Sequence, residues 1–142
     1  MEKYAIIDES AFPLITIQFT GAKSTDENFI AYLQENKNCY RHKEKLGIIF
    51  DATNASLPSL KHQQMQAAWL KENKGLMEAY CLGTAYVIPS AALRSILRVI
   101  FSIQKQPVPY QIFEHVSEAE TWLQSLLAQV PRNQSTSNSK PI

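Results

Sequence analysis

Two apolar runs, separated by a segment with helical periodicity, constrain the fold of this chain more than any other feature. Leu46–Phe50 (LGIIF) and Cys81–Pro89 (CLGTAYVIP) are almost continuously apolar, as strands buried on both faces of a sheet are. Between them Met65, Ala68 and Trp69 recur at the i, i+3, i+4 spacing of a helix that buries one face. This order predicts two parallel strands joined by a helical crossover.

The flanking segments extend this pattern in both directions. Tyr4–Ile7 and Leu14–Thr20 are predicted to pair as a hairpin, because turn residues and Pro13 separate them. A helix over Ala91–Ile103 and a last strand over Pro107–Phe113 follow the second apolar run. The element order ββαβαβαβα predicts an α/β fold with a mostly parallel central sheet and an N-terminal hairpin.

Short signals predict where three of the helices begin or end. Ser24 and Glu27, and again Ser117 and Glu120, have the spacing of a capping box at a helix N-terminus. Gly75 is predicted to end the second helix, because glycine commonly follows the last helical residue.

Length and composition predict one cytoplasmic domain, residues 1–128, followed by a disordered tail, 129–142, that has little to bury. The net charge of +1 gives no global field for nucleic acid, and no apolar run is long enough to span a membrane. Cys39 and Cys81 are predicted to be free thiols. The spacing of Cys39 and His42 supplies at most half a metal site, so we expect no metal and no cofactor.

Asp51, at the end of the first apolar run, raises the possibility of a phosphoreceiver domain. Such a domain needs an acidic pair after its first strand and a lysine after its last strand. Asp8 and Glu9 instead lead into a hairpin, and Lys105 precedes the last strand. Asp51 is therefore interpreted as a turn former whose carboxylate accepts nearby backbone N–H groups.

The third helix carries a broad apolar arc beside a narrow polar stripe. Arg94 and Arg98 lie on the stripe, and Leu97 and Phe101 lie at the border of the arc. Neighbouring helices could cover this border, or it could be an exposed interface for a second copy, a protein partner or a lipid surface.

Four segments resemble the STAS superfamily, the fold of sulphate-transporter regulatory domains and anti-sigma-factor antagonists, and especially a group of small bacterial STAS-like proteins. They are FPLITIQFTG, LGIIFDATNAS, AYVIPSAALRSILRVIF and PVPYQIFEHVSEAETWL, within Tyr4–Leu127. The resemblance implies helices mainly on one side of the sheet and no catalytic activity. It also implies a regulatory or partner-binding turn around Asp51, Thr53, Ser56 and Ser59, although the Asp-Ser-x-Gly sequence of the antagonists is absent.

Three functions remain open at this point. The first is a non-enzymatic STAS-like regulatory module that binds a protein partner or forms a homodimer. The second is a carrier or sensor of a lipid or other apolar small molecule, by analogy with the CRAL-TRIO lipid carriers that share this plan of sheet and helices. The third is an enzyme, for which the sequence offers no set of catalytic residues.

Overall fold

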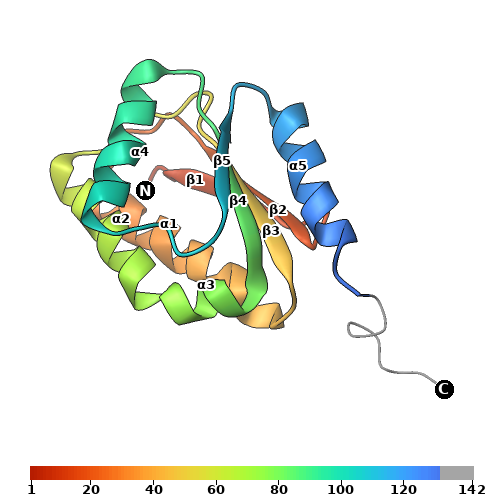
Figure 1. The fold of residues 1–142 in the computed structure, drawn as a ribbon. Coiled ribbons are helices and arrows are strands. Elements are labelled where there is room, and N and C mark those ends of the chain that lie inside the picture. The colour runs from red at the N-terminus through yellow and green to blue at the C-terminus, as the bar shows by residue number, and fades with distance from the viewer. Residues whose placement is uncertain (132–142) are drawn as a thin grey trace.

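The two continuous apolar runs form neighbouring parallel strands at the centre of a five-stranded sheet (Figure 1). The computed structural model describes residues 1–131. The strands are β1 (Ala5–Asp8), β2 (Leu14–Phe19), β3 (Leu46–Asp51), β4 (Cys81–Val87) and β5 (Tyr110–Phe113). The helices are α1 (Asp26–Asn38), the short 3-10 helix η1 (Cys39–His42), α2 (Leu60–Glu72), α3 (Lys74–Tyr80), α4 (Ala91–Ile103) and α5 (Val116–Ala128).

The sheet has the strand order β1-β2-β3-β4-β5. β1 and β2 form an antiparallel hairpin, and β2 to β5 pair in parallel. The prediction of an α/β fold with a mostly parallel sheet and an N-terminal hairpin is confirmed. The structure adds two short elements to the predicted order, namely η1 after α1 and α3 after α2.

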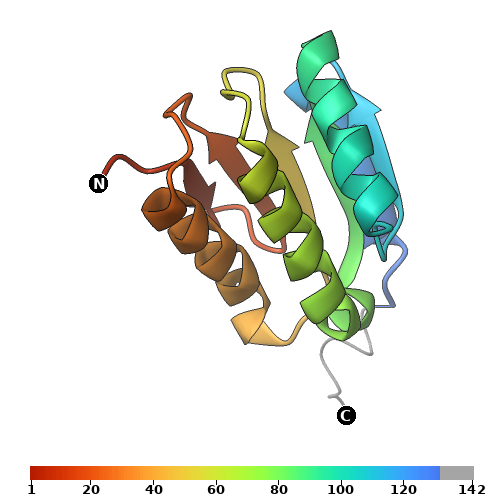
Figure 2. The ribbon, with the colours of Figure 1, turned by 90° about the vertical axis from the view of Figure 1, so that its left-hand side faces the viewer.

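The helices form two unequal layers on the sheet. α1, α2 and α4 lie side by side over one face, and α5 lies on the opposite face (Figures 1 and 2). Side chains alternate along the strands, so Phe50 and Tyr86 face the three-helix layer while Ile49 and Ala85 face α5. The sheet therefore separates two hydrophobic clusters.

The start of α1 differs from the predicted capping box by one residue. Thr25 is the N-cap: its side chain accepts the Asn28 N–H, and the Asn28 side chain accepts the Thr25 N–H at 2.8 Å. The assignment of Ser24 and Glu27 to these positions was therefore wrong. Asparagine replaces the expected glutamate because its shorter side chain also reaches two backbone carbonyls beyond the helix.

α5 begins two residues earlier than the Ser117–Glu120 spacing predicted. His115 is the N-cap, and Glu118 accepts its backbone N–H at 3.2 Å. The segment carries glutamates at 118 and 120, and the first of them makes the capping contact.

The second helix is not followed by the loop that Gly75 predicted. α2 ends at Asn73, whose side-chain amide donates to the Trp69 carbonyl at 2.9 Å. The chain then starts α3, which contains Gly75 and buries Met77. The helix break therefore lies at Asn73, whose side-chain amide and backbone N–H both donate to the Trp69 carbonyl.

Two glycines let α5 approach the sheet closely. A Cβ atom on Gly83 would lie 2.8 Å from Leu126 Cδ1, and one on Gly47 would lie 3.1 Å from Leu123 Cδ2. These strand positions favour glycine because the side chains of α5 already fill the space that a larger residue would need.

α5 ends at the last residue of the predicted domain. The tail predicted to be disordered, 129–142, lies outside the described residues from position 132 onward. Within residues 1–131, no helix combines the length and apolar character that a membrane crossing requires. In the same range, no cluster of three or more His, Cys, Asp or Glu side chains could hold a metal ion.

Candidate functional site

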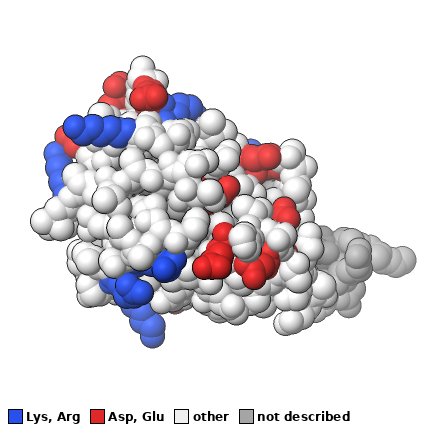
Figure 3. All heavy atoms as spheres, turned by 90° about the horizontal axis from the view of Figure 1, so that it is seen from above, with Lys and Arg blue, Asp and Glu red and all other residues white. Residues whose placement is uncertain are grey.

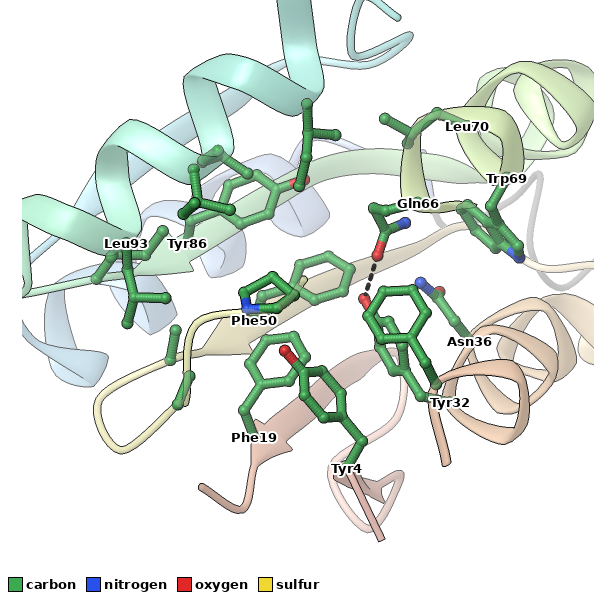
Figure 4. Close-up of a pocket in the computed structure, with 18 of the residues that line it drawn as sticks. Tyr4, Phe19, Tyr32, Asn36, Phe50, Gln66, Trp69, Leu70, Tyr86 and Leu93 are labelled. Carbon is green, nitrogen blue, oxygen red and sulfur yellow. Dashed lines mark hydrogen bonds between the residues drawn. The ribbon is translucent and has the colours of Figure 1, made fainter. Parts of the chain in front are cut away.

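An apolar cavity of about 100 Å³ lies between the sheet and the layer of α1, α2 and α4 (Figure 4). β2, β3 and β4 contribute Phe19, Phe50 and Tyr86, and α2 contributes Trp69 and Leu70. Further apolar side chains of α4 complete the wall on the other side: Leu93, Ile96, Leu97, Ile100 and Phe101. A cavity with such a lining is the usual setting for a bound small molecule.

The cavity forms above a row of aromatic rings on adjacent strands. Phe50 pairs in register with Ile17 and Tyr86, and Phe19 lies two residues beyond Ile17 on the same face. The rings of Phe19 and Phe50 lie 17° from parallel, and those of Phe50 and Tyr86 lie 10° from parallel. These bulky side chains hold α2 and α4 away from the backbone of the sheet.

Two buried polar side chains line the cavity without hydrogen-bond partners. Asn36 on α1 is 1% exposed, and neither its Nδ2 nor its Oδ1 makes a hydrogen bond of normal geometry. Tyr40 in η1 is 2% exposed, and its hydroxyl makes no hydrogen bond of normal geometry, although it lies near the Cys81 thiol and partly opposes the rise that burial causes in the pKa of that group. Buried polar atoms without partners cost stability and are rare in native proteins. Both side chains lie on the cavity wall.

Four other polar side chains of the cavity wall pair with one another. The Tyr32 hydroxyl donates to Gln66 Oε1 at 2.8 Å (Figure 4), and Gln106 Nε2 donates to the Tyr86 hydroxyl at 2.6 Å. Burial raises the pKa of Tyr32 well above its ordinary value, an effect that the neighbouring Asn36 amide partly opposes. Burial likewise raises the pKa values of Tyr40 and Tyr86, so these phenols stay protonated and neutral.

The cavity opens at the end of the sheet where the parallel strands finish. Ala55, Ser56 and Pro58 from the loop after β3 line one side, and Leu93 from the first turn of α4 lines the other. All four are half-buried. Seen from this end (Figure 3), a broad uncharged surface lies between groups of acidic and basic side chains.

The turn residues singled out in the sequence lie beside this opening and have structural partners. Asp51 accepts the Thr53 hydroxyl at 2.6 Å and the Thr53 N–H at 3.1 Å, the contacts of a turn former. Ser56 donates to the Ala22 carbonyl, and Ser59 is the N-cap of α2. Thr53 and Ser59 are exposed, and Ser56 is half-buried.

The four interface residues of α4 do not share one exposed strip. Leu97 is buried and Phe101 half-buried, and both face the cavity. Arg94 donates to the carbonyls of Ile88 and Pro89, so it holds the start of α4 to the end of β4. Arg98 is exposed. The helices and sheet therefore cover the apolar border, which was one of the two alternatives.

A chain of three polar residues joins the first turns of α1 and α2. His62 Nδ1 lies 2.8 Å from the Ser24 hydroxyl, and His62 Nε2 lies 2.9 Å from Asp26 Oδ1. Serine hydrolases use these residue types for catalysis. Here Asp26 is exposed and also paired with Lys61, and the His62 ring stacks on Phe29. This arrangement holds two helix ends together.

Cys39 and His42, the half metal site of the sequence, point to different surroundings. Cys39 is a buried free thiol, whereas His42 lies 3.2 Å from Glu9. Arg41 donates two hydrogen bonds to the same carboxylate. Glu9, an acidic residue that a phosphoreceiver domain would require, is therefore part of an ion pair.

Sequence reasoning missed Asn36 and Tyr40. One signal was present, because Phe29, Leu33 and Asn36 follow the spacing of one helix face, which places an amide on the buried stripe of α1. No comparable signal marked Tyr40. A scan of protein-family models and a search of curated proteins found no match to the chain.

Proposed function

We propose that this protein binds a small, largely apolar molecule between its sheet and the layer of α1, α2 and α4, as a carrier or sensor of that molecule. The observation that carries the proposal is the cavity itself, which combines an apolar wall with two buried, unpartnered polar side chains, Asn36 and Tyr40. A core selected for stability alone would fill a cavity of this size and would give buried polar atoms hydrogen-bond partners.

The chemistry of the wall favours an organic ligand over a cluster of waters. Most of the lining is aromatic or aliphatic, and much of its polar content is already paired, as between Tyr32 and Gln66. A buried water needs two to four polar partners, so this wall offers few positions for one. An apolar ligand instead gains from removing its surface from water.

The proposal agrees with the resemblance to STAS-like and CRAL-TRIO-like domains and contains no catalytic step and no cofactor. It places the protein in the cytoplasm, where Cys39 and Cys81, both buried and free, remain reduced.

Native mass spectrometry and tryptophan fluorescence together test the proposal. Protein purified from cells without organic solvent should carry a small-molecule adduct that chloroform extracts. Trp69 lines the cavity and Trp122 lies against the other face of the sheet, so the Trp122→Phe variant reports on the cavity through Trp69 alone. Iodobenzene, a neutral single-ring probe whose heavy atom quenches tryptophan, should quench that fluorescence in a saturable way.

Two alanine substitutions provide the matched comparison. Ala55→Phe, made in the Trp122→Phe background, places a ring at the opening without adding a tryptophan and should abolish iodobenzene binding, because Ala55 lines the cavity. Ala68 is exposed, although its spacing with Met65 and Trp69 predicted the buried face of α2. Ala68→Phe in the same background should therefore leave iodobenzene binding unchanged. Absence of both an adduct and saturable binding would contradict the proposal.

A second candidate is a protein-contact surface that forms a homodimer. Leu57 and Leu60 beside the cavity opening are 55% and 63% exposed, so two large apolar side chains meet solvent within four residues of chain. Sedimentation velocity of the wild type and of the Leu57→Ser, Leu60→Ser double variant tests this candidate. A wild type that is monomeric at all accessible concentrations would remove it.

A further inference from the structure

We infer that the ligand is uncharged and carries an amide-like group, with a hydrogen-bond donor and an acceptor side by side, that pairs with the carboxamide of Asn36. The inference rests on the proposed function, because it assumes that the cavity is occupied.

The lining excludes a permanently charged ligand. None of the described residues that line the cavity is Lys, Arg, His, Asp or Glu. Arg94, which follows the lining residue Leu93 in α4, donates to two backbone carbonyls at the end of β4. An ionised carboxylate or ammonium would therefore lose its hydration without gaining a partner of opposite charge.

The position of Asn36 determines which polar group can be recognised. Its side chain comes from the last turns of α1, next to Tyr32 and behind the Tyr32–Gln66 hydrogen bond, and lies at the cavity wall (Figure 4). Neither amide atom makes a hydrogen bond of normal geometry, although the amide lies close enough to Tyr32 to oppose part of the rise that burial causes in the pKa of that phenol. The side chain therefore offers an N–H donor group and an acceptor oxygen in the same plane. Amides, lactams and protonated carboxylic acids are the groups that satisfy both at once.

α1 also contains a buried asparagine whose side chain has all its hydrogen-bond partners within the protein. Asn28 is 3% exposed, and its side chain accepts the Thr25 N–H and donates to the carbonyls of Glu2 and Lys23. The contrast between Asn28 and Asn36 indicates that the missing partners of Asn36 come from outside the chain.

The volume of the cavity limits the size of the apolar part of the ligand. The cavity of about 100 Å³ is of the same scale as an engineered apolar cavity of roughly 150 Å³ that binds benzene. Without movement of the helices, a single ring or a short branched chain bearing the polar group fits.

Three small probes of similar size test the inference by NMR titration of the full chain at pH 7. Toluene has the ring without a polar group, phenylacetamide adds the amide, and phenylacetate adds a charge. We expect wild-type protein to bind phenylacetamide about tenfold more tightly than toluene, as one well-formed buried hydrogen-bonding pair provides, and phenylacetate more weakly than either. Shifts should concentrate at Trp69, Tyr86 and Asn36.

Substitutions of Asn36 separate recognition from simple occupancy. Asn36→Leu and Asn36→Ala should remove the tenfold preference for phenylacetamide while toluene still binds. Gln34→Leu replaces an exposed amide on the same helix and should leave all three affinities unchanged. Having two variants at position 36 protects the test against poor folding of one of them.

The outcomes distinguish the two proposals. If toluene binds the wild type but phenylacetamide binds no better, or if phenylacetate binds equally well, the inference about an uncharged amide-like ligand is wrong and the proposed function stands. If none of the probes shifts cavity resonances, the proposed function itself fails.

Discussion

His62 Nε2 lies 2.9 Å from Asp26 Oδ1, and this contact joins the first turn of α2 to the first turn of α1. The ring is almost completely buried and stacks on Phe29, whose own side chain lines the cavity. Asp26 also pairs with Lys61 at 2.8 Å. Hydrogen bonds from Lys61 and then from His62 hold the pKa of Asp26 below its ordinary value of 3.8.

Asp26→Asn should therefore destabilise the protein in a pH-dependent way. Because the folded state lowers the pKa of Asp26, the carboxylate contributes its full stabilisation above about pH 4. This contribution is lost as the pH falls through the folded-state pKa. Urea unfolding should show a difference in free energy between wild type and variant that is largest near pH 7 and shrinks below pH 4.

Glu27→Gln is the control for this prediction. It removes the same charge from the same helical turn, but no hydrogen bond or ion pair joins the Glu27 side chain to the described residues. A loss of stability at pH 7 as large as that of Asp26→Asn would show that the effect comes from the helix dipole alone.

Replacement of Asn36 should make the protein more stable although it weakens ligand recognition. Asn36→Leu removes two unpartnered buried polar atoms, so we expect the free energy of unfolding without ligand to rise by about 1 kcal/mol. Asn28→Leu, on the same helix, breaks three hydrogen bonds and should lower it by about 2 kcal/mol. Chemical denaturation measures both, and destabilisation by Asn36→Leu would contradict the assignment.

Both thiols should resist alkylation in the native protein. Burial raises the pKa of Cys39 to about 12 and that of Cys81 to about 11. At pH 8 the lower thiolate fraction alone should slow the reaction of Cys81 about 100-fold relative to an unperturbed thiol. Iodoacetamide labelling followed by mass spectrometry measures this rate. Two modifications should appear rapidly in denaturant, and rapid labelling of the folded protein would contradict the burial.

Two glycine-to-alanine substitutions should have opposite effects. Gly83→Ala places a Cβ atom 2.8 Å from Leu126 and should lower the free energy of unfolding by about 1–3 kcal/mol. Gly75→Ala, in α3, has no atom within 4 Å of the new Cβ and should raise it by about 0.5–1 kcal/mol. Thermal melts of the two variants compare them directly, and a neutral Gly83→Ala would show that α5 is free to move outward.

The sequence predicted the elements whose patterns are long or continuous. Leu46–Phe50 was recognised because almost every residue is apolar. The predicted helix Ala91–Ile103 coincides with α4, which begins after the N-cap Ser90. α3 was missed because seven residues are too few to show periodicity and Gly75 signalled a helix end. The caps of α1 and α5 were misplaced because several residues nearby can accept the same N–H groups.

The cavity could not be predicted, because it depends on how elements far apart in the chain are spaced. The turn Asp51–Ser59 was recognised as a distinct segment, and part of it lies at the cavity opening. Leu97 and Phe101 were considered as a possible outer surface because periodicity gives a helix face but not its direction. Asn36 and Tyr40 gain their significance only from the absence of partners, which depends on three-dimensional contacts.

The tight contact of α5 with Gly47 and Gly83 gives the two sides of the sheet different mechanical properties. Because α5 packs closely against the other face of the sheet, we expect the strands to bend little when the volume of the cavity changes. The strain of admitting a guest molecule then falls on α2 and α4, which contact each other at the edges of the cavity. Occupancy would be transmitted outward as a shift of these two helices, at the surface that carries Arg98 and the exposed leucines Leu57 and Leu60.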